Sequence, residues 1–452
     1  MASPLPETPR SALDRLGRAP RLRLAWLSGS VAVVSVLGGV GRRLLDLAVG
    51  LVGTVLTAPV ALVTAALAAS RKTPWIRHRT YLGRGMSPVQ LGELPSAGPF
   101  ARLPWLWALL RGDLTLVGPA PTPEEERAAL GPADLPRFQV RPGLANLFRL
   151  REAANIAFEG RSAADLEQVH TAGFARELGI LVRSVPAALI GVRVSAPPRE
   201  IRLLDVRIDN WTMEGALAWI AATPRGARTR QLAFVNPDCL NKAFEQPGYR
   251  EVLARADVVL PDGIGIHYAC RMTGTALAAN VNGTDLFPRL CAAAEESGRS
   301  VYFLGARPGV VEALVVKCRE RWPRLQIAGR RDGFFARGGD EERAVVDAIR
   351  ASSPDLLLVA FGAPSQDLWI AAQLEKLGAR VAIGVGGLFD FYSGRVARAP
   401  QWMRELGLEW VWRLLQEPGR MWRRYVIGNP LFLYRVWRWR RRGPYDDARS
   451  PK

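Results

Sequence analysis

Three polar side chains stand in short turns that follow apolar runs, and each could take part in chemistry. Asp262 follows Pro261 in a glycine-flanked turn, where a carboxylate could act as a general base. Its alternative role is to cap the following helix, and position alone favours that role. Gln366 could hydrogen-bond a sugar or a phosphate, or only begin a helix. Asp390 could accept a hydrogen bond from a ribose hydroxyl, or again cap a helix.

These side chains belong to a set of five turn motifs. The motifs are NPD (236–238), PDGIG (261–265), LGARPG (304–309), GAPSQDLW (362–369) and GVGGLFDF (384–391). Small glycine-rich turns let backbone N–H groups approach a diphosphate closely. LGARPG, which contains Gly305, has this character although it lacks a full GxGxxG pattern. Five such turns in one fold indicate a phosphate-binding site better than any one alone.

The elements that must position these turns are short apolar runs separated by amphipathic helical segments. The strand candidates are 231–236, 256–260, 300–305, 325–329, 355–362 and 380–387. Near-continuous apolar strands that alternate with helices predict an α/β fold, a doubly wound and mostly parallel sheet with helices on both faces. Ligands bind at the carboxyl ends of such strands, where the five motifs lie.

Residues 395–442 form a basic, tryptophan-rich segment with helical spacing. They contain twelve Arg against three Glu, and six of the fourteen Trp residues of the chain. Guanidinium groups pair with phosphates and indoles lie at the apolar–polar boundary, so the segment suits a membrane surface or a pyrophosphate. The alternative is a solvated basic helix with a few core Trp residues. No DxD motif occurs, so a leaving diphosphate would need protein cations, which this segment can supply.

The totals narrow the class of protein further. A chain of 452 residues predicts two or three domains, and a net charge of +19 predicts an acidic partner. The three His residues show no metal-ligand spacing, so neither a metal nor a cofactor is predicted. The four Cys residues lie far apart without a CxxC, which suits a reducing compartment: Cys239, Cys270, Cys291 and Cys318.

The N-terminal residues predict a membrane association. Residues 1–23 are rich in Pro and Arg and are predicted to be disordered. Residues 24–40 are apolar but short, whereas 44–69 are long enough for a bilayer and contain Pro59. Basic residues flank both ends of 44–69, which favours the cytoplasmic side for both. A helix broken at the proline that re-enters the same leaflet and a kinked spanning helix both remain open. No cleavable signal peptide is expected.

Two runs that follow resemble the membrane-bound bacterial sugar transferases. The runs are LPWLWALLRGDLTLVGPAP (103–121) and VRPGLANLFRL (140–150), and the resemblance covers 42–150. That family transfers a sugar phosphate to polyprenyl phosphate. Its catalytic Asp-Glu pair is replaced here by Ala101 and Arg102. A methyl group cannot serve as the nucleophile, so the resemblance implies a degenerate domain that serves as an anchor or a partner surface.

The second half resembles the WecG/TagA/CpsF glycosyltransferases (glycosyltransferase family 26). The matching motifs include NPD, PDGIG, NGTDLFP (282–288), GAPSQ, GVGGLFDFYSG (384–394), RAPQWM (398–403), GLEWVWRL (407–414) and EPGRMWRRY (417–425). The resemblance implies a metal-independent, inverting transfer of a sugar, often of the N-acetylmannosamine type. The donor would be a UDP-sugar, and the acceptor would be linked to polyprenyl diphosphate.

The same resemblance implies roles for individual residues. The base would be Asp262, the substrate-contacting amide Gln366, and the nucleotide-side carboxylate Asp390. The remaining substrate- or nucleotide-binding candidates are Asn236, Asp238, Gly263, Asp285, Gly305, Arg413, Arg420, Arg423 and Arg424. Phe234 and Asn280 replace a Thr and an Arg that the family commonly has near its active site, which bears on donor and acceptor identity.

The predicted domains are a sugar-transferase-like domain at 24–195, a linker at 196–200, a glycosyltransferase domain at 201–394, the appendage at 395–442 and a tail at 443–452. We expect a membrane-associated, mainly helical first domain at the cytoplasmic face of the cell membrane.

A bifunctional enzyme and an inactive scaffold remain alternatives. A dehydrogenase is disfavoured by the missing GxGxxG pattern. A nucleic-acid partner is disfavoured because Trp and Leu interleave the arginines. Homo-oligomerisation is left open.

Overall fold

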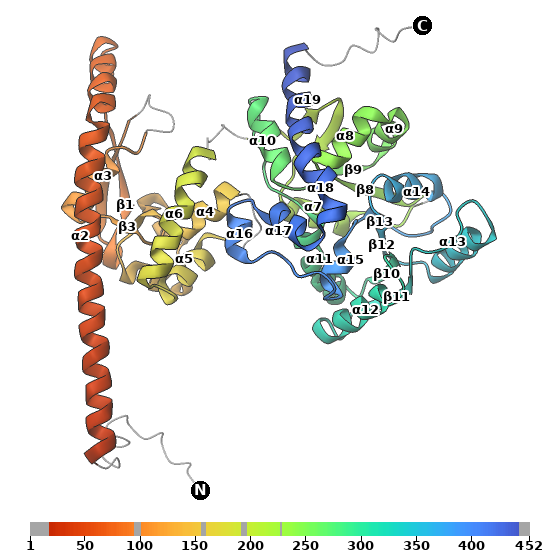
Figure 1. Cartoon of the computed structure of the whole chain (residues 1–452), viewed down its shortest axis with the longest axis horizontal. Helices are drawn as coiled ribbons and strands as arrows, with labels where there is room; N and C mark the ends of the chain where they lie inside the picture. The colour runs from red at the N-terminus through yellow and green to blue at the C-terminus, as the bar shows by residue number, and fades with distance from the viewer. Residues whose placement is uncertain (1–17, 95–100, 155–159, 191–196, 227, 443–452) are drawn as a thin grey trace. The chain divides into compact units, whose positions relative to one another are not determined.

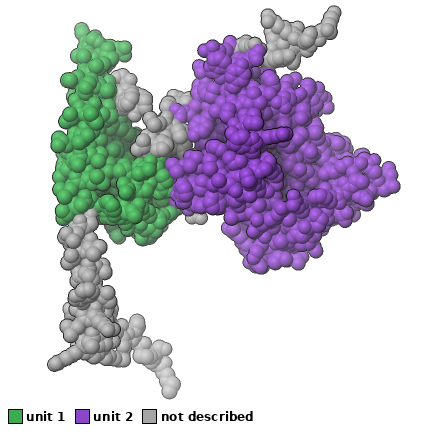
Figure 2. Space-filling model, in the orientation of Figure 1, with its two compact units in different colours: residues 1–150, 159–190 green, residues 151–158, 191–452 purple. Residues whose placement is uncertain are grey.

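The computed structural model forms two compact units (Figure 2). One unit comprises residues 1–150 and 159–190, and the other comprises 151–158 and 191–452. The structure describes residues 18–94, 101–154, 160–190, 197–226 and 228–442. The predicted tail at 443–452 and most of the predicted disordered start therefore lie outside the described residues. Residues 18–23 correct that prediction, because they already belong to a helix.

Helix α2 (Arg18–Ser70) dominates the first unit and runs without interruption through Pro59 (Figure 1). The helix break that a re-entrant hairpin requires is therefore absent from α2. Part of this helix, Gly39–Ser70, is long and apolar enough to cross a membrane by length and composition, the one such helix in the described part of the chain. Its apolar side chains are largely exposed, with Leu56 at 72% and Leu62 at 70%.

The rest of the first unit contains two small sheets that the sequence did not predict. Strands β1 (Arg77–Leu82), β2 (Pro88–Glu93) and β4 (Thr122–Pro123) form an antiparallel sheet, and β3 (Thr115–Val117) pairs in parallel with β5 (Gly143–Ala145). The helical elements are α3 (Trp105–Arg111), α4 (Leu147–Ala154), α5 (Arg161–His170), α6 (Phe174–Ile190) and the short turns η1 (Arg84–Met86), η3 (Glu124–Ala129) and η4 (Pro132–Gln139). Trp105 is fully buried at the centre of the core.

The second unit is built on a six-stranded parallel sheet, as predicted. Its strands are β8 (Arg230–Val235), β9 (Val258–Pro261), β10 (Ser300–Gly305), β11 (Gln326–Arg331), β12 (Leu356–Ala360) and β13 (Val381–Gly384). Their order is β11-β10-β12-β13-β8-β9. All six strand candidates are confirmed to within a few residues. A hairpin of β6 (Glu200–Leu203) and β7 (Val206–Asp209) precedes the sheet and was not predicted.

Alternate strand residues bury two different cores, so helices cover both faces of the sheet. Leu232 packs in one core with residues of α7 (Met213–Ala222), α11 (Gly283–Ser297), α12 (Val310–Arg321) and α15 (Leu388–Tyr392). Its neighbour Ala233 packs in the opposite core with residues of α8 (Pro237–Glu245), α9 (Pro247–Arg255), α10 (Ile264–Met272) and α19 (Gly428–Arg442). Helices α13 (Asp340–Ser352) and α14 (Ser365–Gln373) extend this second layer beside β10 and β12.

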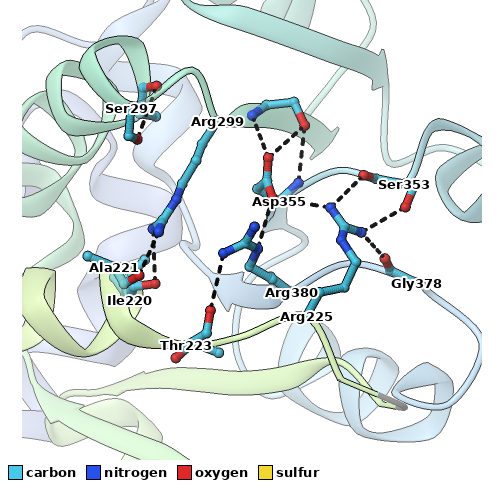
Figure 3. Close-up of polar contacts among 12 residues, drawn as sticks. Ile220, Ala221, Thr223, Arg225, Ser297, Arg299, Ser353, Asp355, Gly378 and Arg380 are labelled. Carbon is cyan, nitrogen blue, oxygen red and sulfur yellow. Dashed lines mark hydrogen bonds and ion pairs between the residues drawn. The ribbon is translucent and has the colours of Figure 1, made fainter.

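A polar network at the amino ends of the strands fixes the register of β10 and β12 (Figure 3). Asp355 precedes β12 and accepts a hydrogen bond of 2.9 Å from the Ser300 N–H. Its other oxygen lies 2.9 Å from Arg380 Nε and 3.1 Å from Arg225 Nη2. Burial alone would raise its pKa, but these donors outweigh burial and lower the pKa of Asp355.

We expect Asp355→Asn to lower the free energy of unfolding by about 2 kcal/mol at neutral pH, because the change leaves two guanidinium groups without their carboxylate. The lowered pKa means that this contribution is present above about pH 4 and is lost as the pH falls further. Thermal unfolding of the full chain at several pH values measures both effects. Equal melting temperatures for wild type and variant at pH 7 would contradict the assignment.

The C-terminal appendage consists of short helices that end in the longer α19. They are α16 (Gln401–Glu405), α17 (Glu409–Gln416), α18 (Pro418–Trp422) and the π-helical turn η5 (Arg423–Ile427). Large apolar side chains are exposed on them, among them Leu415 at 70%, Trp422 at 52% and Ile427 at 54%. Exposed Arg and Trp residues together suit a membrane interface.

Candidate active site

The carboxyl ends of β8 and β13 form a crevice, because the chain leaves these neighbouring strands toward opposite faces of the sheet. Helix α8 follows β8 and contributes to one core, whereas α15 follows β13 and contributes to the other. Doubly wound sheets bind ligands at such a switch point. Asn236 caps α8 by accepting hydrogen bonds of 3.1 Å from Asp238 N and Cys239 N, so the helix N-terminus faces the crevice.

A cavity of about 580 Å³ occupies this crevice. Eight of the predicted site residues line it: Asn236, Asp238, Asp262, Gln366, Arg413, Arg420, Arg423 and Arg424. They come from the turns after β8, β9 and β12 and from the appendage. Four guanidinium groups therefore face turns that begin helices, and this arrangement suits an anionic ligand such as a diphosphate.

A second cavity of about 160 Å³ adjoins the first. Seven residues line both cavities: Asn236, Asp238, Asp262, Thr284, Phe391, Arg413 and Arg424. The smaller cavity also has an aromatic wall, where the rings of Trp410 and Tyr425 lie 6.0 Å apart. Two cavities with one shared wall can hold two substrates side by side, and Asp262 belongs to that wall.

Asp262 is chemically suited to accept a proton. Burial raises the pKa of its carboxyl group, and the guanidinium of Arg424 and the amide of Asn236 oppose this rise. A raised pKa makes a carboxylate a stronger base. The turn after it is held by Asn280, whose Oδ1 accepts a 2.8 Å hydrogen bond from Gly263 N. Gly263 itself lines the second cavity.

Gln366 fixes two loops of the larger cavity to each other. Its buried side chain accepts hydrogen bonds from Gly362 N at 3.1 Å and from Gly386 N at 2.9 Å. A Cβ on Gly384 would lie 2.7 Å from Gln366 Nε2, so the amide packs directly against the end of β13. Gln366 is thus both a lining residue and a positioning residue for the loops after β12 and β13.

The arginines of the appendage are held by few partners. Arg424 Nε lies 3.7 Å from Asp238 Oδ2, and the Arg413 guanidinium lies 4.9 Å from the centre of the Phe391 ring. In the described residues neither Nε atom makes a hydrogen bond. Arg420 pairs with Glu417 at 3.3 Å, and Arg423 is exposed at the cavity edge. These groups retain donors for an incoming anion.

Three predicted site residues line neither cavity. Asp285 is buried, with its carboxylate 2.6 Å from Arg398 Nη2 and its N–H donated to Asn282 Oδ1, so it ties the appendage to α11. Asp390 lies 3.3 Å from Arg395 Nη1.

Gly305 has a positive φ of 125°, and a Cβ there would lie 2.6 Å from the Ala360 oxygen. That glycine permits the close approach of β10 and β12 rather than the approach of a ligand.

Sequence reasoning missed several lining residues. Lys242 Nζ contacts Asp238 Oδ2 at 2.8 Å and donates to the Ala363 oxygen at 2.9 Å. It stands one helical turn after Asp238 on α8, and that i, i+4 spacing was the available signal. Phe391, Trp410 and Tyr425 lie within the recognised motifs but carry no charge to draw attention. The two departures from the family pattern also lie here, since Phe234 lines the larger cavity and Asn280 the smaller one.

Behind Gln366 lies Asp367, a fully buried carboxyl group that accepts a 2.9 Å hydrogen bond from the Tyr249 hydroxyl. Burial raises the pKa of Asp367 to about 7, against the opposing effect of Tyr249 and Gln366. The unfolded chain would lose this proton near pH 3.9. The protonated group therefore favours folding fully below about pH 4, and that contribution is lost as the pH rises to about 7.

We expect Asp367→Asn to remove this pH dependence. The melting temperature of the wild type should fall relative to that of the variant between about pH 4 and pH 7. Thermal unfolding of the full chain in detergent measures the difference. Asp347→Asn, a change at an exposed carboxylate on α13, is the matched control. Parallel curves for wild type and Asp367→Asn would contradict the raised pKa.

No group of three or more His, Cys, Asp or Glu residues in the described part of the chain is arranged to hold a metal ion. The cations that line the cavities are Lys242 and the arginines.

Comparison with known proteins decides the family. Residues 201–445 match the glycosyl transferase WecG/TagA/CpsF family. The chain belongs to this family. Its second half is therefore a glycosyltransferase, and the crevice at β8 and β13 is the candidate active site of a WecG/TagA/CpsF enzyme. Residues 89–191 match the bacterial sugar transferases. The matched segment begins 47 residues after, and ends 41 residues after, the segment 42–150 over which the sequence resemblance was predicted.

Similar proteins include three named N-acetylglucosaminyldiphosphoundecaprenol N-acetyl-beta-D-mannosaminyltransferase. The protein from Bacillus spizizenii (strain W23) is 38% identical over 191 residues, which are 42% of this chain and 72% of that protein. The Bacillus subtilis (strain 168) protein is 35% identical over 195 residues, 43% and 74% respectively. The Staphylococcus aureus (strain MW2) protein is 30% identical over 239 residues, 52% and 92% respectively.

Proposed function

We propose that this WecG/TagA/CpsF enzyme transfers an N-acetylmannosamine-type sugar from a UDP-sugar to an acceptor sugar linked to polyprenyl diphosphate. The observation that carries the proposal is the wall between the two cavities, where Asp262 stands beside Arg413 and Arg424. The similarity to three transferases of N-acetylmannosamine supports the choice of donor and acceptor. The product would enter the synthesis of a cell-surface polysaccharide.

In the proposed reaction the larger cavity takes the UDP-sugar and the smaller one takes the acceptor sugar. Asp262 accepts the proton of the acceptor hydroxyl as its oxygen attacks the anomeric carbon. The bond from that carbon to the UDP oxygen breaks, and the configuration inverts. The arginines of the appendage stabilise the negative charge that develops on the departing diphosphate. The proton remains on Asp262 until solvent takes it up.

The test is a screen of UDP-sugars with the purified full chain and a short-chain lipid diphospho-N-acetylglucosamine, read by mass spectrometry. We expect the lipid to gain one N-acetylhexosamine residue when UDP-N-acetylmannosamine is the donor. Turnover should persist in EDTA, because protein cations stand at the diphosphate. No product with any UDP-sugar would contradict the proposal, and loss of turnover in EDTA would contradict its metal-independent form.

We further propose that the enzyme works at the cytoplasmic face of the membrane. Gly39–Ser70 and the exposed apolar side chains of the appendage support membrane association, and a nucleotide-sugar donor supports the cytoplasmic side. Flotation of the full chain with anionic liposomes, compared with retention on DNA at matched salt, separates a lipid surface from a nucleic acid. Retention on DNA without flotation would contradict the assignment.

We propose that the first unit does not transfer sugar phosphates. Arg102, at one of the two family carboxylate positions, lies 3.8 Å from Glu93 and 4.7 Å from the centre of the Trp105 ring. A guanidinium cannot act as the missing nucleophile. The full-length Asp262→Asn variant, given nucleotide sugars and polyprenyl phosphate, should form no polyprenyl diphosphosugar. Such a product would support a bifunctional enzyme instead.

A further inference from the structure

The first unit contains a cavity of about 410 Å³ that the proposed function does not use. Four arginines line it, Arg42 and Arg43 from α2, Arg84 from η1 and Arg141 from the turn before β5. Two carboxylates, Asp46 and Glu177, also line it. The cavity therefore gathers an excess of positive charge beside the start of the apolar part of α2.

Both carboxylates are already bound. Asp46 is buried and accepts hydrogen bonds from Thr115 Oγ1 at 3.0 Å and from Leu116 N at 2.7 Å. Glu177 lies 2.8 Å from Arg42 Nη2. Neither Asp46 nor Glu177 is paired with Arg84 or Arg141. The positive charges of Arg84 and Arg141 are therefore not neutralised by an ion pair with these carboxylates.

The arginines differ in how far they are engaged. Arg43 donates to the Leu109 and Leu110 oxygens, at 2.6 and 2.8 Å. Arg84 and Arg141 are exposed, and no ion pair joins either guanidinium to a carboxylate of the described residues. These two remain available for an anion.

Two backbone turns pack closely against each other beside the cavity. The turns at Gly118 and Gly143 touch through their backbones, because a Cβ on Gly143 would lie 2.0 Å from Gly118 N. Gly143 N donates to the Pro119 oxygen at 2.8 Å. Neither glycine can accept a side chain without displacing the other turn. This contact fixes the backbone that carries Arg141 next to the cavity.

An apolar surface leads away from the same cavity along α2. Leu44, Leu51 and Leu56 on this helix are exposed by 62%, 60% and 72%. A cluster of basic groups at the end of an exposed apolar helix is the arrangement that binds an anionic headgroup while the lipid chains cover the helix. A soluble anion would gain nothing from the apolar surface.

We propose that this cavity binds the phosphate headgroup of a membrane lipid through Arg84 and Arg141, and that it holds the lipid without reacting with it. Ala101 and Arg102, at the positions of the missing catalytic pair, do not line the cavity. The site would serve as a lipid-specific tether of the first unit, independent of the glycosyltransferase reaction.

The test measures binding of NBD-labelled phosphatidic acid and NBD-labelled phosphatidylcholine to the full chain in neutral detergent. We expect preferential binding of phosphatidic acid. An Arg84→Gln/Arg141→Gln variant should bind it about 30-fold more weakly, since each basic group near a lipid phosphate contributes about 1 kcal/mol. Arg84→Gln alone should weaken binding about fivefold, which keeps the test valid if the double variant is unstable.

The matched control is Arg71→Gln/Arg77→Gln, which removes the same charge from exposed positions outside the cavity. This control should bind phosphatidic acid as the wild type does. Equal loss in both double variants would overturn the proposal in favour of non-specific surface charge. Displacement of the lipid by inorganic phosphate at micromolar concentration would overturn the lipid as the ligand, and equal binding of both lipids would overturn phosphate recognition.

Discussion

Asp262→Asn is expected to lower kcat by about 10²–10⁴-fold, which is the usual value of a general base. The amide keeps the shape of the side chain but cannot accept the proton of the acceptor hydroxyl. Because burial raises the pKa of Asp262, wild-type kcat/KM should rise with pH through a value above the ordinary range of an aspartate. Initial rates of product formation across pH, read by mass spectrometry, measure both effects.

Two controls separate a lost base from a damaged protein. UDP-sugar binding by Asp262→Asn should stay within about threefold of wild type, because the donor diphosphate is held by the arginines. Asp347→Asn, the same chemical change at an exposed position of α13, should leave the rate unchanged. Turnover by Asp262→Asn at the wild-type rate would mean that another group removes the proton.

The second large effect is expected at Arg424. Arg424→Gln should lower kcat/KM by about 10²–10³-fold, because it removes a cation from the wall shared by both cavities. Its side chain is 27% exposed and its nearest carboxylate, Asp238, is 3.7 Å away, so most of its charge remains available to a ligand. Steady-state rates with each substrate varied in turn measure the change.

Arg438→Gln is the matched control for Arg424→Gln. Arg438 is an exposed arginine on α19 that lines neither cavity. The Arg438→Gln enzyme should keep the wild-type kcat. A weaker binding to membranes without a change in kcat would be consistent with the position of Arg438. An Arg424→Gln enzyme with unchanged kcat/KM would show that the appendage does not neutralise the diphosphate.

The sheet of the second unit could be predicted because its signals are local. Six apolar runs, each followed by a turn, correspond to the six parallel strands, and the motifs after them meet at one edge. Asp262 and Gln366 were found for this reason. Distances between side chains are not local, however. Asp285 and Asp390 also stand in the first turn of a helix. Each carboxylate, however, pairs with an arginine of the appendage, Asp285 with Arg398 and Asp390 with Arg395.

Other differences also arise from tertiary contacts. Gly305 stands in a turn of the kind that binds phosphate, but it lines neither cavity, and the backbone of Ala360 takes the space that a side chain at this position would need. Pro59 left a broken, re-entrant helix and a kinked spanning helix both open, and α2 continues through the proline. Three strands of the small sheets, β3, β4 and β5, are only two or three residues long, too short for a periodic pattern to reveal.

Arg413 and Arg424 line both cavities, and this sharing has a thermodynamic consequence. A guanidinium that pairs with one diphosphate has fewer donors left for a second, so two anionic substrates that use the same pair are energetically coupled. Occupancy of one cavity should then alter the dissociation constant of the other substrate, and by linkage the effect is reciprocal. Kinetically, such coupling favours a defined order of substrate addition and links departure of the spent nucleotide to release of the lengthened lipid.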